Sequence, residues 1–108
     1  MPAFRIAMVG VPPLLAGLIR RGLASRIADV AVSEIADLQH AAARLRDAGA
    51  DVVVLGPAAP PADAMLIRRI VPGAQVLTVS SDLARLVDLD TGAGVAFTSD
   101  ALAEYMRR

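Results

Sequence analysis

Length, composition and charge limit the kinds of protein that this chain can be. Its 108 residues suffice for one hydrophobic core, and we expect residues 1–108 to form a single domain. Eleven basic and eleven acidic residues cancel, which argues against direct nucleic-acid binding by this domain. The chain has no Cys, so it has neither disulfides nor thiolate ligands, which suits a cytoplasmic location. No apolar run is long enough to span a membrane.

The first half of the sequence alternates apolar runs with helical patterns. Residues 5–9 read as a buried strand, and Pro13 suits the first turn of a helix, where its missing N–H is not needed. A second strand is predicted over residues 28–33 and a second helix over residues 34–48, with Asp37 as a cap. The apolar stripe of the first helix is predicted to consist of Leu14, Leu15, Leu18, Ile19 and Leu23.

The second half begins with the clearest strand, residues 51–55, in which three consecutive Val favour extended structure buried on both faces. The elements predicted after it are a helix, a strand, a short helix, a strand and a last helix ending at Arg108, over residues 62–71, 75–79, 82–88, 95–97 and 99–108. Ser80 and Ser81 are candidate caps for the short helix.

The resulting order is a strand followed by a helix, repeated five times. Such alternation predicts a parallel sheet with helices on both faces and right-handed connections. At this length we expect the flavodoxin-like (βα)5 arrangement, a doubly wound parallel sheet with strand order 2-1-3-4-5.

Several segments are similar to response-regulator receiver domains of two-component signalling. The segment RIAMVGVPPLLAGL (5–18) resembles the opening of the branch that usually carries a C-terminal helix-turn-helix. The segment DVVVLGPAAPPADAMLIRRI (51–70) resembles the central strand and the loop after it. VLTVSSD (76–82) and GAGVAFTSD (92–100) resemble the fourth and fifth strands, so the resemblance covers essentially the whole chain.

The residues that receivers use for phosphoryl chemistry are missing. The resemblance places the phosphoacceptor Asp at Gly56, the magnesium-binding acids at Gly10 and Val11, and the Lys of the fifth strand at Thr98. Only the switch hydroxyl is retained, as Thr78, and the chain contains no Lys anywhere. We call Gly10, Val11, Gly56, Thr78 and Thr98 the degenerate phosphorylation pocket.

These replacements remove the chemistry of the pocket. Mg²⁺ requires hard oxygen ligands, and phosphoryl transfer depends on positioning and charge neutralisation around the metal. We therefore expect no enzymatic activity, no catalytic residues, no metal site and no cofactor. The sequence favours a phosphorylation-independent pseudo-receiver that acts as a signalling or regulatory protein-interaction module.

The resemblance also implies a face for partner contact. In receivers, the helices that flank the fifth strand commonly mediate dimerisation, and the residues nominated there are Arg85, Asp88, Asp100, Tyr105 and Arg107. The alternative is that the neighbouring apolar residues simply form the core, which we favour for Leu83, Leu86 and Leu102. We expect a protein partner, a homodimer or both, and no membrane contact, while a DNA-binding domain could follow in a longer chain.

A second functional hypothesis is a small-ligand sensor. Open α/β sheets bind ligands at the carboxyl ends of their strands. The crevice predicted there is lined by Gly10, Pro12, Gly56, Pro57, Thr78 and Thr98. His40, the only His, reads as a solvated helix residue rather than as a metal ligand or catalyst.

Overall fold

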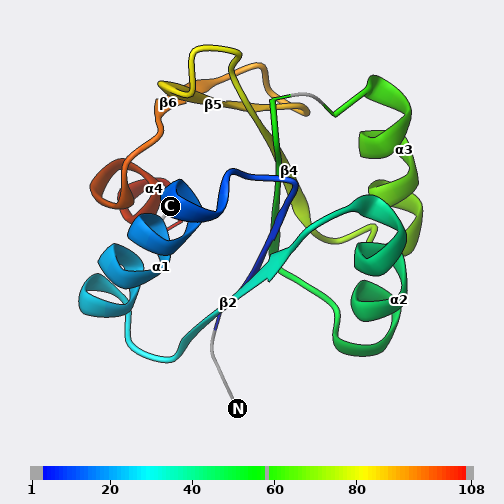
Figure 1. The fold of residues 1–108 in the computed structure, drawn as a ribbon, viewed down its shortest axis with the longest axis horizontal. Helices are drawn as coiled ribbons and strands as arrows, with labels where there is room; N and C mark the ends of the chain where they lie inside the picture. Colours follow the sequence, from blue (N-terminus) through cyan, green and yellow to red (C-terminus); the bar gives the residue numbers. More distant parts are fainter. Residues whose placement is uncertain (1–3, 58, 107–108) are drawn as a thin grey trace.

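Apolar runs and helical patterns form a layered α/β fold, which the computed structural model describes for residues 4–57 and 59–106 (Figure 1). The strands of this part of the chain are β1 (Phe4–Val9), β2 (Val30–Ile35), β3 (Val52–Leu55), β4 (Gln75–Val79), β5 (Arg85–Asp88) and β6 (Gly94–Ala96). Its helices are α1 (Pro13–Arg26), α2 (Leu38–Ala48), α3 (Pro61–Ile70) and α4 (Ser99–Met106).

The strands form one six-stranded sheet in the order β2-β1-β3-β4-β5-β6 within the described residues. Strand β1 pairs with β2 and β3, and β3 pairs with β4, all in parallel, so the first four strands take their predicted places. Strands β5 and β6 are antiparallel to their neighbours. The fully parallel (βα)5 sheet with order 2-1-3-4-5 is therefore not matched, and the sheet is mixed.

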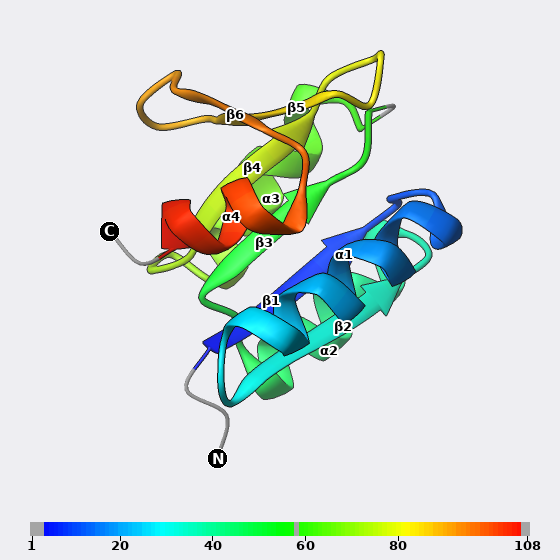
Figure 2. The same cartoon turned by 90° about the vertical axis from the view of Figure 1, so that its left-hand side faces the viewer.

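Helices cover the sheet on both faces, α1 and α4 on one and α2 and α3 on the other (Figures 1 and 2). The central strand β3 is covered by helices on both faces, so its run of Val residues supplies apolar side chains to both. Val52 and Val54 pack toward α1 and α4, whereas Val53 and Leu55 pack toward α2 and α3. All four side chains are buried, which confirms the predicted burial of this strand on both faces.

Helix α1 begins at Pro13 as predicted, but its apolar stripe differs from the predicted one. Its buried residues are Ala16, Ile19 and Leu23, whereas Leu14 is 81% exposed and Leu18 is 53% exposed. The helix has more large apolar side chains than one face can bury. The small Ala16 sits against the core, and this turns Leu14 and Leu18 outward.

The predicted helix over residues 82–88 is wrong, because the chain turns at residues 80–84 and returns as β5 beside β4. The amide of Ala84 donates to Asp82 Oδ1 at 3.0 Å, and the amide of Arg85 donates to Ser80 Oγ at 3.0 Å. Leu83 has a left-handed φ of 62° in this turn. Ser and Asp side chains that cap helices also close turns, and here Ser80 and Asp82 close the turn before β5.

Strand β6 confirms the predicted strand near residues 95–97, but the inserted β5 displaces it outward by one place. The last helix is found as α4, and the predicted end at Arg108 lies outside the described residues. Within the described residues, no helix combines the length and apolar character needed to cross a membrane.

We predict that Leu86→Ala lowers the free energy of unfolding by about 2–5 kcal/mol, because Leu86 is fully buried in β5. Leu83→Ala is the control, and we expect it to cost less than about 1 kcal/mol, since Leu83 is 37% exposed in the turn. Urea denaturation measures both. Equal losses would contradict the strand, because a helix would bury both leucines.

Candidate functional site

The carboxyl ends of β1 and β3 are joined by backbone contacts. The amide of Gly56 donates to the carbonyl oxygen of Val9 at 2.8 Å, and the amide of Gly10 donates to that of Ile35 at 2.9 Å. Gly10 has a left-handed φ of 69°, a conformation that favours glycine. The loop after β1 therefore bends over the end of β3.

Gly56 has no room for a side chain. A Cβ atom on its backbone would lie 2.7 Å from the carbonyl carbon of Gly10, and closer still to the carbonyl oxygen. It would also lie 3.3 Å from the backbone nitrogen of Val11. The backbone itself therefore occupies the place that the resemblance assigns to a phosphoacceptor side chain.

The other degenerate pocket residues do not form a polar cluster. Val11 is 8% exposed and packs in the core with Ala16. Thr98 is exposed, and its Oγ1 accepts from the amide of Ala101 at 3.1 Å in the first turn of α4. In the described part of the chain, no group of three or more His, Asp or Glu side chains could hold a metal ion.

Thr78 lies apart from Thr98 because β5 separates their strands. Thr78 pairs with Leu55 of β3 and Val87 of β5 and is half-buried. Thr98 follows β6, which is one place further from β3 than the predicted sheet order would put it. The structure therefore brings Gly10, Val11 and Gly56 together but does not gather the pocket as a whole.

Asp88 is an internal anchor that connects β5 with α4. It is 2% exposed, and its carboxylate accepts from the hydroxyl of Tyr105 and from the amide of Asp90 at 2.8 Å. The amide of Thr91 donates to it at 3.3 Å. Burial raises the pKa of Asp88, but these donors outweigh burial and hold the pKa below its usual value.

The remaining interface candidates have different surroundings. Arg85 is exposed on β5 and does not lie on a helix, and it points to the opposite face from Asp88. Asp100 forms an ion pair with Arg26 of α1, and its side chain is 72% exposed. Arg107 lies outside the described residues.

His40 is exposed near the start of α2. Its Nδ1 lies 2.8 Å from Oδ1 of Asp37, and its amide donates to the same carboxylate at 2.9 Å. Asp37 is thus the cap that the sequence predicts, and these bonds lower its pKa.

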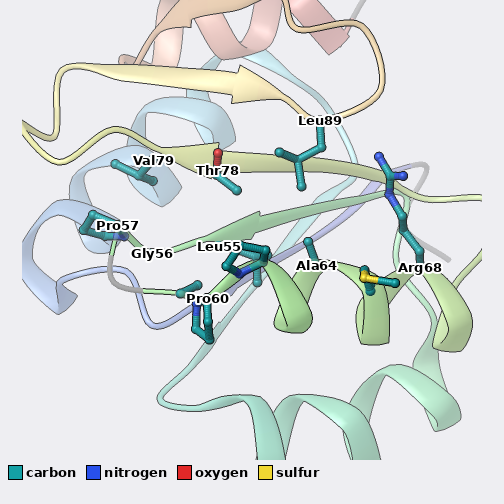
Figure 3. Close-up of a pocket in the computed structure, with 12 residues that line it drawn as sticks. Leu55, Gly56, Pro57, Pro60, Ala64, Arg68, Thr78, Val79 and Leu89 are labelled. Carbon is teal, nitrogen blue, oxygen red and sulfur yellow. The ribbon is translucent and has the colours of Figure 1, made fainter.

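A cavity of about 420 Å³ lies beside α3, at the carboxyl ends of β3 and β4 (Figure 3). Of the crevice residues predicted from the sequence, Gly56, Pro57 and Thr78 line it, whereas Gly10, Pro12 and Thr98 do not. Met65, Arg68 and Leu89 also line it, and the sequence does not predict this role for any of the three. No local signal marks them, because the cavity exists where the helix predicted after β4 is missing.

Comparisons with known proteins support the fold. No family model matches the sequence, and no curated protein matches it. Among solved structures, the chain is similar to the RcsB response regulator of Salmonella typhimurium, described for its conformational dynamism in DNA interaction. The identity is 19% and the TM-score 0.61, over 74% of this chain and 43% of that chain. The chain thus has a receiver-domain-like α/β fold and spans less than half of that structure's length.

We predict that Gly56→Ala lowers the free energy of unfolding by about 1–3 kcal/mol or more, because the new methyl group meets the backbone of Gly10. The control is Gly17→Ala in α1, where nothing lies within 4 Å of the added Cβ. That change is expected to stabilise the protein by about 0.5–1 kcal/mol. Thermal and urea melts compare them, and a neutral Gly56→Ala would refute the close approach.

Asp88→Asn is predicted to cost about 1–3 kcal/mol at neutral pH, because it removes charge-assisted hydrogen bonds from a buried group. The pKa of Asp88 is lowered by folding, so its contribution is present above its unfolded pKa of about 3.9. That contribution is lost as the pH falls through the lower folded pKa.

Urea melts between pH 7 and pH 2 therefore measure a smaller acid-induced loss of stability for Asp88→Asn than for the wild type. Parallel curves for Asp88→Asn and the wild type would argue against the internal anchor.

Proposed function

We propose that this chain is a phosphorylation-independent pseudo-receiver that acts as a protein-interaction module in signalling or regulation. The observation that carries the proposal is the contact between the loop after β1 and the end of β3. A receiver accepts its phosphoryl group on a side chain at the position of Gly56, and here the Gly10 carbonyl group takes that space.

The charge pattern of the site supports the same proposal. Val11 is packed in the core where a metal-binding acid would stand, so no carboxylate from that position reaches the site. The sequence has no Lys to neutralise a phosphoryl group. Without the acceptor carboxylate, the metal-binding acids and the Lys of a receiver, the end of the sheet keeps a single backbone arrangement in this proposal, and regulation passes through contacts on the surface.

The exposed apolar surface is what an interaction module requires. Leu14 and Leu18, one turn apart on α1, are 81% and 53% exposed. Contiguous exposed apolar side chains mark protein–protein contact sites. A homodimer or a separate protein partner would bury it.

The proposal is tested by incubating the protein with acetyl phosphate and Mg²⁺ and measuring its intact mass. We expect no gain of a phosphoryl group, while a phosphorylatable receiver treated in parallel gains one. We also expect Gly56→Asp to stay unphosphorylated, because the restored carboxylate cannot be seated at that backbone position. A phosphoryl adduct on the wild type would disprove the proposal.

Native mass spectrometry over a range of concentrations then separates the two kinds of partner. A concentration-dependent dimer that is unaffected by acetyl phosphate supports self-association. A strict monomer rules out the homodimer and restricts the proposal to a different protein partner.

A further inference from the structure

The cavity beside α3 results from the replacement of a helix by a hairpin. Helices α2 and α3 cover the face of the sheet formed by β1 and β3, but after β4 the chain turns directly into β5 (Figure 1). The side chains of Thr78 and Val87 on this face are therefore only half-buried. A helix predicted over residues 82–88 would have crossed this space.

The walls of the cavity are mostly apolar. Leu55 and Ala64 are buried at its base, and Met65 and Leu89 lie at its opening, where they are 60% and 38% exposed. Pro57 and Arg68 lie at opposite ends (Figure 3). A volume of about 420 Å³ falls within the range typical of small-molecule sites.

Two polar groups in this apolar setting have unused hydrogen-bonding capacity. Thr78 Oγ1 makes no hydrogen bond with the described part of the chain. Arg68 pairs with Asp90 through Nη2, and its other guanidinium donors make no hydrogen bond within residues 4–57 and 59–106. A guanidinium has five N–H donors in a planar fork, which matches a carboxylate. Asp90 thus fixes Arg68 at the cavity and leaves donors for a second acid.

We propose that this cavity binds a small, mostly apolar organic acid. Its carboxylate contacts Arg68 and its apolar body lies against Ala64, Met65 and Leu89. The few polar groups then set the orientation and the apolar walls supply most of the contact area. Asp90 is a positioning residue for Arg68. Gly56 lines this cavity, but the proposed contacts with the acid do not involve its contact with Gly10, and the site does not depend on the proposed interaction function.

The test titrates the full ¹⁵N-labelled chain with octanoate and follows its amide resonances by NMR. Octanol and octylamine serve as probes with the same chain length but without the negative charge. We expect saturable shifts for octanoate at Thr78, Met65 and Leu89, weaker binding of octanol and the weakest binding of octylamine. Shifts that do not saturate, or that map to another face, would overturn the proposal.

Substitutions at three exposed positions, Arg68, Arg69 and Asp90, test the contact with the acid. Arg68→Gln is expected to weaken octanoate binding about tenfold or more, because a charge-assisted hydrogen bond is lost, and to leave octanol binding unchanged. Arg69→Gln is the matched control, since Arg69 is exposed on the same helix and does not line the cavity. It should retain wild-type affinity.

Asp90→Asn separates ligand contact from a merely structural ion pair. It breaks the Arg68–Asp90 pair but keeps the guanidinium, so octanoate should bind less tightly than to the wild type, because Arg68 is no longer positioned, but more tightly than to Arg68→Gln. If Asp90→Asn and Arg68→Gln weaken binding equally, Arg68 acts only through the ion pair, and the proposed contact with the acid is wrong. Equal affinities for Arg68→Gln and Arg69→Gln would also refute it.

Discussion

The close approach of the Gly10 carbonyl group to Gly56 constrains the whole carboxyl edge of the sheet. Strands β1 and β3 are neighbours in register, and the bond from Gly56 to Val9 continues their pairing beyond the end of β3. Only residues without a Cβ allow the two backbones to come this near. Glycine at this position is thus a packing requirement, at the place where the resemblance to receivers puts an acid.

The hairpin after β4 has consequences on both faces of the sheet. On one face it brings Asp88 under α4, where the carboxylate accepts hydrogen bonds from the Tyr105 hydroxyl and from two backbone amides. On the other face it leaves Thr78 and Val87 without a helix above them. The same insertion therefore fixes the C-terminal helix through an internal hydrogen-bonded acid and opens a cavity beside α3.

The elements that depend on local chemistry could be predicted from the sequence. The Val run of β3, the proline at the start of α1 and the Asp37 cap of α2 each follow from neighbouring residues. The hairpin could not be predicted in this way, because Ser80 and Asp82 suit a helix cap and a turn equally well. The candidate site was predicted only in part. The missing acids are visible in the sequence, whereas the blocked space at Gly56 and the cavity depend on distant segments meeting.

The strand pairs of the mixed sheet differ in the length of chain that connects the two partners. Strand β5 pairs with β4 through a short turn, and β6 pairs with β5 in the same way. Such local pairings cost little loop-closure entropy, whereas the parallel pairs of β1, β2, β3 and β4 must each wait for a helical crossover. We therefore expect the pairing of the parallel strands, rather than the β4–β5–β6 meander, to limit the rate of folding.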